Sequence, residues 1–244
     1  MNGQILKTLV IMQLKKLFRT PANLFLSVLF PAILTVTFGI GFNDPESGMT
    51  VHTMAPGLIS YAIIFIIMTI SMSFAEDRDQ GLLKRINTTP TTSSEFMGSH
   101  IISNMIISLV QVALVFGIAL LIGFNPTGNA GSYILAIIVI ALFSLSSVGL
   151  GLITATIAKN PGAATGTSFI FILPQMFFGT FIPLNTNTQV IAMALPSFHA
   201  TEALISLFSG IINANVLINI AFIAGFSIVV VILGVFLFKK YGNA

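Results

Sequence analysis

Six long runs of apolar residues divide this chain, and short polar segments separate them. Each run is at least as long as the roughly 20 helical residues needed to cross a hydrocarbon core about 30 Å thick. Strands of a membrane barrel would alternate apolar and polar residues, whereas these runs are apolar on every face. The pattern therefore predicts an all-α polytopic membrane protein, a single domain over 1–244 with six transmembrane helices. The runs cover 22–42, 54–74, 101–124, 132–157, 163–182 and 216–238.

The basic residues are distributed unevenly among the polar segments. All ten Lys and Arg lie before the first run, between the second and third, between the fourth and fifth, or after the sixth. The alternate loops carry no Lys or Arg, only Asp44, Glu46 and Glu202. Because short loops rich in Lys and Arg stay on the cytoplasmic side, both termini are expected to be cytoplasmic.

The composition agrees with a membrane protein. The chain is 55% hydrophobic and 7% charged, against about 25% charged residues in soluble domains. The net charge of +3 is therefore assigned to cytoplasmic loops, and nucleic-acid binding is excluded. The run 22–42 is longer than the apolar part of a signal peptide and contains Pro31, so we interpret it as an uncleaved first span.

The chain lacks the residues that several kinds of chemistry require. The chain has no Cys, and none of the six runs contains Asp, Glu, Lys or Arg. This argues against an ion-coupled transporter, because buried ionisable groups mark ion pathways, although backbone carbonyls at broken helices can also bind sodium. The chain also lacks a Gly-rich phosphate loop for nucleotide hydrolysis. His52, His100 and His199 are interpreted as solvated or interfacial side chains, and no metal site or cofactor is expected.

Residues 4–19 have the pattern of a basic amphipathic helix. Apolar residues recur at helical spacing, and basic residues lie mostly elsewhere. Such a helix is expected to lie in the headgroup plane with its apolar face toward the lipid. A passive anchor and a docking site for a partner protein remain equal alternatives. Its key residues are Leu6, Leu14, Lys15, Lys16, Phe18 and Arg19.

The segment 75–97 between the second and third runs is more ordered than a solvated loop requires. A charged cluster is followed by Gly81, a short amphipathic stretch, a turn at Pro90, and Ser93 or Ser94 as a candidate helix cap. Seven of the seventeen charged residues lie here. The order predicts a rigid projection that engages another protein.

Small residues in the fourth and fifth runs would let helices approach closely. Packing within the subunit is favoured over a seam between two subunits. These residues are Gly149, Gly151, Ala163, Ala164, Gly166 and Ser168.

Three ordered motifs resemble the permeases of ABC type-2 (ABC-2) exporters, bacterial membrane subunits of drug, lipid and glycan export. In the 75–97 segment the matching residues are Glu76, Gly81, Leu83, Thr89, Pro90 and Glu95, while Leu82 replaces the usual Thr. Leu173–Pro174 followed by 178–184 is similar to the family's fifth span. The stretch 195–204 is similar to its final external segment, although Ile205 stands where the family has an Arg.

The resemblance implies a function in which 75–97 forms a coupling helix on a separate ATPase subunit, which binds the ATP. The coupling residues would be Glu76, Asp77, Arg78, Gly81, Leu83, Lys84, Arg85, Pro90 and Glu95. A second permease subunit, identical or different, would complete the transporter. By the same resemblance, Met68, Ser71, Met72, Phe177 and Phe178 could line the path of an apolar or amphiphilic substrate.

Residues 183–213 are expected to form an external helix or a re-entrant segment. The expected location is a bacterial plasma membrane. Two alternatives remain open: a secondary transporter driven by an ion gradient, and a non-transporting membrane assembly protein.

Overall fold

The computed structural model describes residues 3–42, 46, 49–82, 85, 88, 91–180 and 184–241. The elements of this part of the chain are helices, as the sequence predicts. They are α1 (Gly3–Arg19), α2 (Pro21–Leu24), the π-helical turn η1 (Phe25–Leu29), α3 (Phe30–Gly41), α4 (Val51–Ile64), α5 (Ile66–Asp79), α7 (Ser93–Ile122), α8 (Ala130–Ile157), α9 (Pro161–Phe178), α10 (Thr186–Ala192), α11 (Pro196–Phe208) and α12 (Ala214–Tyr241).

Four helical segments are long and apolar enough to cross a membrane, namely Val51–Asp79, Ser94–Ile122, Ala130–Ile157 and Ala214–Phe238. The helices α10 and α11 form a pair bent by 104°, and counting that pair as one span would give five. Ser27–Gly41 is a shorter apolar helix. The chain is therefore a multi-pass helical protein, and the prediction of six spans stays a prediction.

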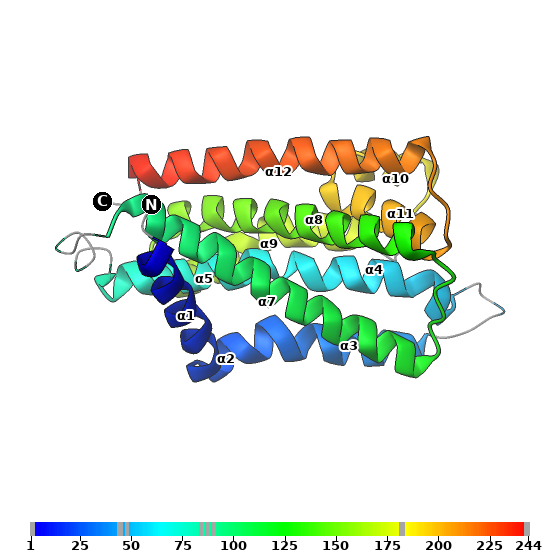
Figure 1. Cartoon of the computed structure of the whole chain (residues 1–244), viewed down its shortest axis with the longest axis horizontal. Helices are drawn as coiled ribbons and strands as arrows, with labels where there is room; N and C mark the ends of the chain where they lie inside the picture. The colour runs from blue at the N-terminus through cyan, green and yellow to red at the C-terminus, as the bar shows by residue number, and fades with distance from the viewer. Residues whose placement is uncertain are drawn as a thin grey trace.

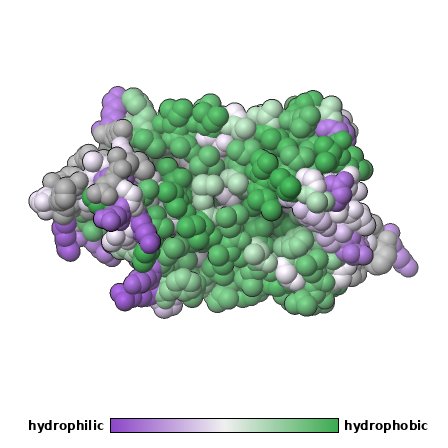
Figure 2. All heavy atoms as spheres, in the orientation of Figure 1, coloured by the Kyte–Doolittle hydropathy of each residue, from purple (hydrophilic) through white to green (hydrophobic). Residues whose placement is uncertain are grey.

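The long helices lie side by side along the long axis of the molecule (Figure 1). One end, here the α1 end, holds α1 and the last turns of α5 and α12; α10 and α11 lie at the opposite end, here the α11 end. The Arg78 guanidinium donates to the carbonyl oxygen of Ala158, so the connection between α8 and α9 also lies at the α1 end. Figure 2 shows a broad hydrophobic band between two hydrophilic ends, as a bilayer requires.

The continuous segment of α4 and α5 is the most enclosed of the candidate spans. Within its most apolar stretch 89% of residues are buried, against 22% for α12. A turn at Phe65 separates the two helices. Because α4 and α5 are surrounded by α7, α8, α9 and α11, they form the centre of the bundle, and α12 forms part of its outer surface.

The small residues of α8 pack within the subunit, as the sequence favours. A side chain at Gly149 would come within 2.9 Å of the backbone of Val230 on α12. At Gly151 it would come within 2.8 Å of the carbonyl oxygen of Ile67 on α5. Gly166 on α9 differs, because no described residue outside its own helix has an atom within 4 Å of its missing Cβ. The small residues of α8 therefore allow close helix packing, whereas Gly166 of α9 faces open space.

The amphipathic helix α1 is present, and part of its apolar stripe packs on the bundle, whereas the sequence predicted that the stripe faces the lipid. Leu17 is buried, Leu14 packs against the same core cluster, and Leu6 lies near Gly98 of α7. Phe18, by contrast, is 71% exposed. That part of the stripe packs on the bundle because α7 offers it a complementary apolar surface, which the sequence of α1 alone cannot reveal.

Candidate coupling site

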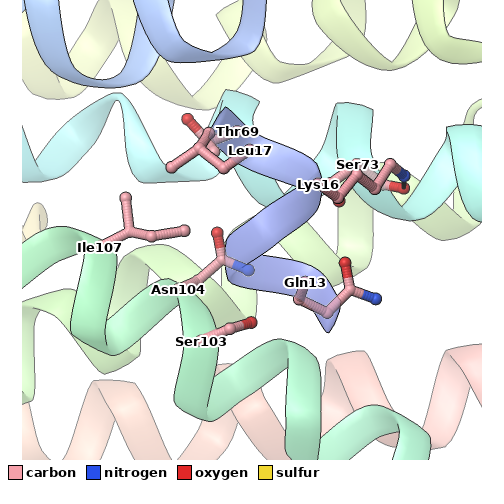
Figure 3. A pocket seen from close by; sticks show the side chains of 8 residues that line it. All are labelled: Gln13, Lys16, Leu17, Thr69, Ser73, Ser103, Asn104 and Ile107. Carbon is pink, nitrogen blue, oxygen red and sulfur yellow. Dashed lines mark hydrogen bonds between the residues drawn. The ribbon is translucent and has the colours of Figure 1, made fainter. Parts of the chain in front are cut away.

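The helix α1 lies across α5 and α7 (Figure 3), at the α1 end of the molecule (Figure 1). It turns Gln13, Lys16 and Leu17 toward a small recess. Thr69 and Ser73 of α5 line the same recess. The spacing of residues 13, 16 and 17 puts all three side chains on one face of a helix. The polar residues of α1 that face the bundle therefore lie beside polar residues of α5 and α7.

A largely buried ion pair joins α1 to α5. The Lys16 Nζ atom lies 2.6 Å from Asp77 Oδ1 and 3.1 Å from Glu76 Oε2. It also donates to the carbonyl oxygen of Ser73 at 3.1 Å. The Asp77 side chain is only 2% exposed. Removing one partner of such a pair leaves the other charge buried without compensation, which typically costs about 3–5 kcal/mol.

His100 extends this pair to α7. Its Nε2 atom lies 3.0 Å from Asp77 Oδ2, and Gln13 Nε2 lies 2.9 Å from the same oxygen. The His100 side chain is fully buried, with its ring centroid 4.9 Å from that of Phe74 and 4.7 Å from that of Phe96. The interpretation of His100 as a solvated or interfacial histidine is therefore wrong.

The hydrogen-bonding contacts of the His100 ring lie at its Nε2 atom. Gln13 Nε2 lies 2.8 Å from His100 Nε2 as well as 2.9 Å from Asp77 Oδ2. His100 Nδ1 has no hydrogen-bond partner among the described residues. Gln13, Asp77 and His100 thus form one buried polar cluster, beside which Lys16 and Glu76 are partly buried.

We call Gln13, Lys16, Glu76, Asp77 and His100 the junction. Two of its members, Gln13 and His100, were not among the predicted site residues. No local pattern links positions 13, 77 and 100, which come together only through tertiary structure. One available signal was the helical spacing of Phe96, His100 and Ile107, which places His100 on the apolar face of α7.

Two of the predicted coupling residues, Glu76 and Asp77, belong to the junction, and others flank it. Gly81 ends α5 with a φ of +69°, in the left-handed region that favours glycine. Glu95 closes a capping box with Thr92, so the cap of α7 is Thr92 and not Ser93 or Ser94. Arg85 is exposed. Leu83, Lys84, Thr89 and Pro90 lie outside the described residues.

The predicted substrate-path residues divide into two groups. Met68 and Ser71 on α5 are buried within the subunit, and Met72 and Phe178 are partly buried. Phe177 on α9 is 48% exposed. Of these five side chains, Phe177 is the most accessible from outside a single subunit, and their role in a path stays a prediction.

Comparison with known proteins decides the family. The family model described as ABC-2 type transporter matches residues 4–209. The chain belongs to the ABC-2 type transporter family. The junction lies within the matched region of this ABC-2 protein, and so do the 75–97 segment and both helices of the bent pair.

The relatives are permeases by name. The chain is 23% identical over 197 residues to the daunorubicin resistance ABC transporter permease protein DrrB1 of Streptomyces coeruleorubidus, covering 78% of this chain and 70% of the relative. It is 25% identical over 222 residues to the putative transport permease ycf38 of Pyropia yezoensis, covering 85% and 75%. The linearmycin resistance permease protein LnrN of Bacillus subtilis is 26% identical over 170 residues, covering 66% and 43%. This ABC-2 protein is thus a membrane permease subunit of an ABC transporter.

Proposed function

We propose that this permease subunit belongs to an ATP-driven exporter that moves an apolar or amphiphilic substrate out of the cell. A separate ATPase subunit would bind and hydrolyse ATP, and a second permease subunit would complete the pathway. The names of DrrB1 and LnrN refer to resistance to daunorubicin and linearmycin, which supports a drug-like or lipid-like substrate. The α1 end would face the cytoplasm of a bacterium, in agreement with the basic residues of α1.

The observation that carries the proposal is the junction. It ties α1, the end of α5 and the start of α7 together through a charged, buried cluster. A force applied to the segment 75–97 would therefore displace three helices as one body instead of bending a loop. ATP binding can shift the permease only if the ATPase contacts its two arrangements differently, and a rigid body transmits such a difference over a distance.

The test compares two acidic residues at the end of α5. Asp77→Asn removes the buried charge of the junction, whereas Asp79→Asn removes a charge from an exposed side chain. The permease and its ATPase are reconstituted in vesicles with an amphiphilic fluorescent dye. We expect Asp77→Asn to abolish ATP-dependent dye transport and transport-stimulated ATP hydrolysis, and Asp79→Asn to retain both. Equal activity of the two variants, at equal amounts of inserted protein, would remove the junction from the mechanism.

The energy source is tested in the same vesicles. Transport should survive collapse of proton and sodium gradients while ATP is present, and it should stop when the catalytic site of the ATPase is disabled. This expectation rests on the apolar runs, which contain no Asp, Glu, Lys or Arg. Dye movement that follows an imposed ion gradient without ATP would establish a secondary transporter instead.

A further inference from the structure

A groove separates α1 from the end of α5 at the polar end of the molecule. Its volume is about 500 Å³. Lys15 and Arg19 of α1 line it together with the apolar side chains of Ile11, Met12 and Leu82. The groove thus combines two cations with an apolar wall.

The positive charge of the groove is not neutralised by the described part of the chain. Lys16 and Asp77 also line the groove, but they are paired with each other. Lys15 and Arg19 are exposed and form no ion pair with any described residue. They are four residues apart on one helix, so their side chains lie on the same face. Two adjacent cations are therefore available to one anionic group.

The hydroxyl groups of the groove do not compete for this role. Thr8 Oγ1 donates its proton to the carbonyl oxygen of Gln4 at 2.9 Å. Thr20 Oγ1 donates to the carbonyl oxygen of Lys16 at 3.1 Å. Lys15 and Arg19 are thus the cationic donors that face the groove and can contact an anion there, and a planar guanidinium beside an ammonium suits the oxygens of a phosphate.

The outer surface of α1 is apolar beside these cations. Ile11 is 42% exposed and Phe18 is 71% exposed, while Val10, Gln13 and Leu17 on the other side of the helix are buried. In Figure 2 the hydrophilic residues at this end lie directly beside the hydrophobic band. Exposed aromatic and aliphatic side chains among basic ones are typical of a helix at the boundary of headgroups and acyl chains.

We propose that the groove binds an anionic phospholipid of the membrane. Lys15 and Arg19 hold the headgroup phosphate, and the acyl chains lie against Ile11, Met12 and the exposed ring of Phe18. An amphiphile matches both the cations and the adjoining apolar surface, whereas an acidic soluble protein would match the cations alone. The site requires a membrane protein but does not require ATP-driven export, so it can be tested without the ATPase.

The experiment measures lipid retained by the purified full-length chain in a neutral detergent. Phosphatidylglycerol is compared with phosphatidylcholine by native mass spectrometry. The test variant is Lys15→Ala/Arg19→Ala, and the control is Lys7→Ala/Lys159→Ala, which removes the same charge from exposed residues that do not line the groove. At about 1 kcal/mol for each basic residue near an anionic surface, the test variant should bind phosphatidylglycerol roughly 30-fold more weakly.

The control should retain its preference for phosphatidylglycerol, and Lys15→Arg/Arg19→Lys should retain most of it. Equal loss in the control would show non-specific attraction and overturn the site. Equal binding of soluble glycerol phosphate would show a phosphate site without lipid. If the soluble ATPase subunit alone protects Lys15 from chemical modification and phosphatidylglycerol does not, the groove is a protein interface and the lipid proposal is wrong.

Discussion

The two ends of the molecule hold their helices together by different means. At the α1 end, the junction uses buried charges, with Lys16 2.6 Å from Asp77. At the α11 end, neutral groups join α11 to α9: Ser197 Oγ donates to the carbonyl oxygen of Gln175 at 3.2 Å, and Thr201 Oγ1 to that of Gly179 at 2.9 Å. His199 of α11 lies 2.7 Å from Asn219 of α12.

The attachment at the α1 end is strong but depends on each of its charged partners. The attachment at the α11 end consists of several weak hydrogen bonds that do not depend on one another. Removing one charge from the junction leaves the remaining charges with fewer partners in a largely buried site, so the cost is large. Removing one hydroxyl at the α11 end costs about one hydrogen bond, roughly 1 kcal/mol. A single substitution is therefore expected to weaken the whole attachment at the α1 end, whereas the α11 end can be weakened by one hydrogen bond at a time.

The most decisive test of this comparison determines on which side of the membrane each end lies. The native chain has no cysteine, so single cysteines can be placed at Thr91, beside the start of α7, and at Asn187 in α10. We expect a membrane-impermeant thiol reagent to label Asn187→Cys in intact cells and Thr91→Cys only after permeabilisation. External labelling at Thr91 would contradict the six-span arrangement with both termini inside.

The largest effect on stability should come from the junction. Asp77→Asn is expected to lower the free energy of unfolding by about 3 kcal/mol, the lower limit for a broken buried pair, because Lys16 keeps its contact with Glu76. Thermal unfolding in detergent measures the change. Asp79→Asn, at an exposed position, should change stability by no more than about 0.5 kcal/mol. A similar small change at Asp77 would show that the junction is not a stabilising attachment.

Substitutions in the turn after α5 should act through the backbone conformation alone. Gly81 has a φ of +69°, and apart from its chain neighbours no described residue has an atom within 4 Å of its missing Cβ, so substitution produces no clash with that part of the chain. Alanine should cost about 1–2 kcal/mol through the left-handed conformation. Proline cannot adopt this φ and removes the N–H that donates to the Arg78 carbonyl oxygen at 3.0 Å.

We therefore expect Gly81→Pro to abolish transport-stimulated ATP hydrolysis and Gly81→Ala to reduce it partly. Both variants should insert into the membrane normally, which cysteine accessibility can check. Normal stimulation in the proline variant would exclude this turn from coupling.

The smallest effect is predicted at the α11 end. Thr201→Val keeps the shape of the side chain and removes its hydrogen bond to Gly179, so stability should fall by about 1 kcal/mol. The control is Ser209→Ala, whose exposed hydroxyl donates to the carbonyl oxygen of Ile205 within the last turn of α11. A loss at Thr201 as large as that for Asp77→Asn would remove the contrast between the two ends.

Much of the fold followed from local pattern. The apolar runs predicted the helices, and α1 (Gly3–Arg19) begins one residue before its predicted start and ends at its predicted end. The predicted first residue of the fifth run, 163, lies two residues inside α9, which begins at Pro161 because Asn160 caps it. These features depend on residues close together in the chain, so sequence alone could supply them.

The functional site could be predicted less completely from the sequence. Asp77 and Lys16 were predicted in separate roles, one in the coupling segment and one on an interfacial helix, but the sequence did not indicate that they pair. His100 was interpreted as a solvated or interfacial histidine because it lies at the end of an apolar run with no second ligand at metal spacing. The structure buries it because Phe74 and Phe96 enclose the ring while Asp77 binds its nitrogen.

The sequence by itself determined that this protein is helical, spans a membrane and carries its basic residues on alternate loops, since hydrocarbon excludes unpaired backbone groups and charges wherever they occur. Only the tertiary structure decided which face of α1 meets the bundle and which polar residues meet each other. Residues 13, 77 and 100 belong to three helices far apart in the chain. Their contact depends on how those helices cross, and a pattern within one helix carries no information about its neighbours.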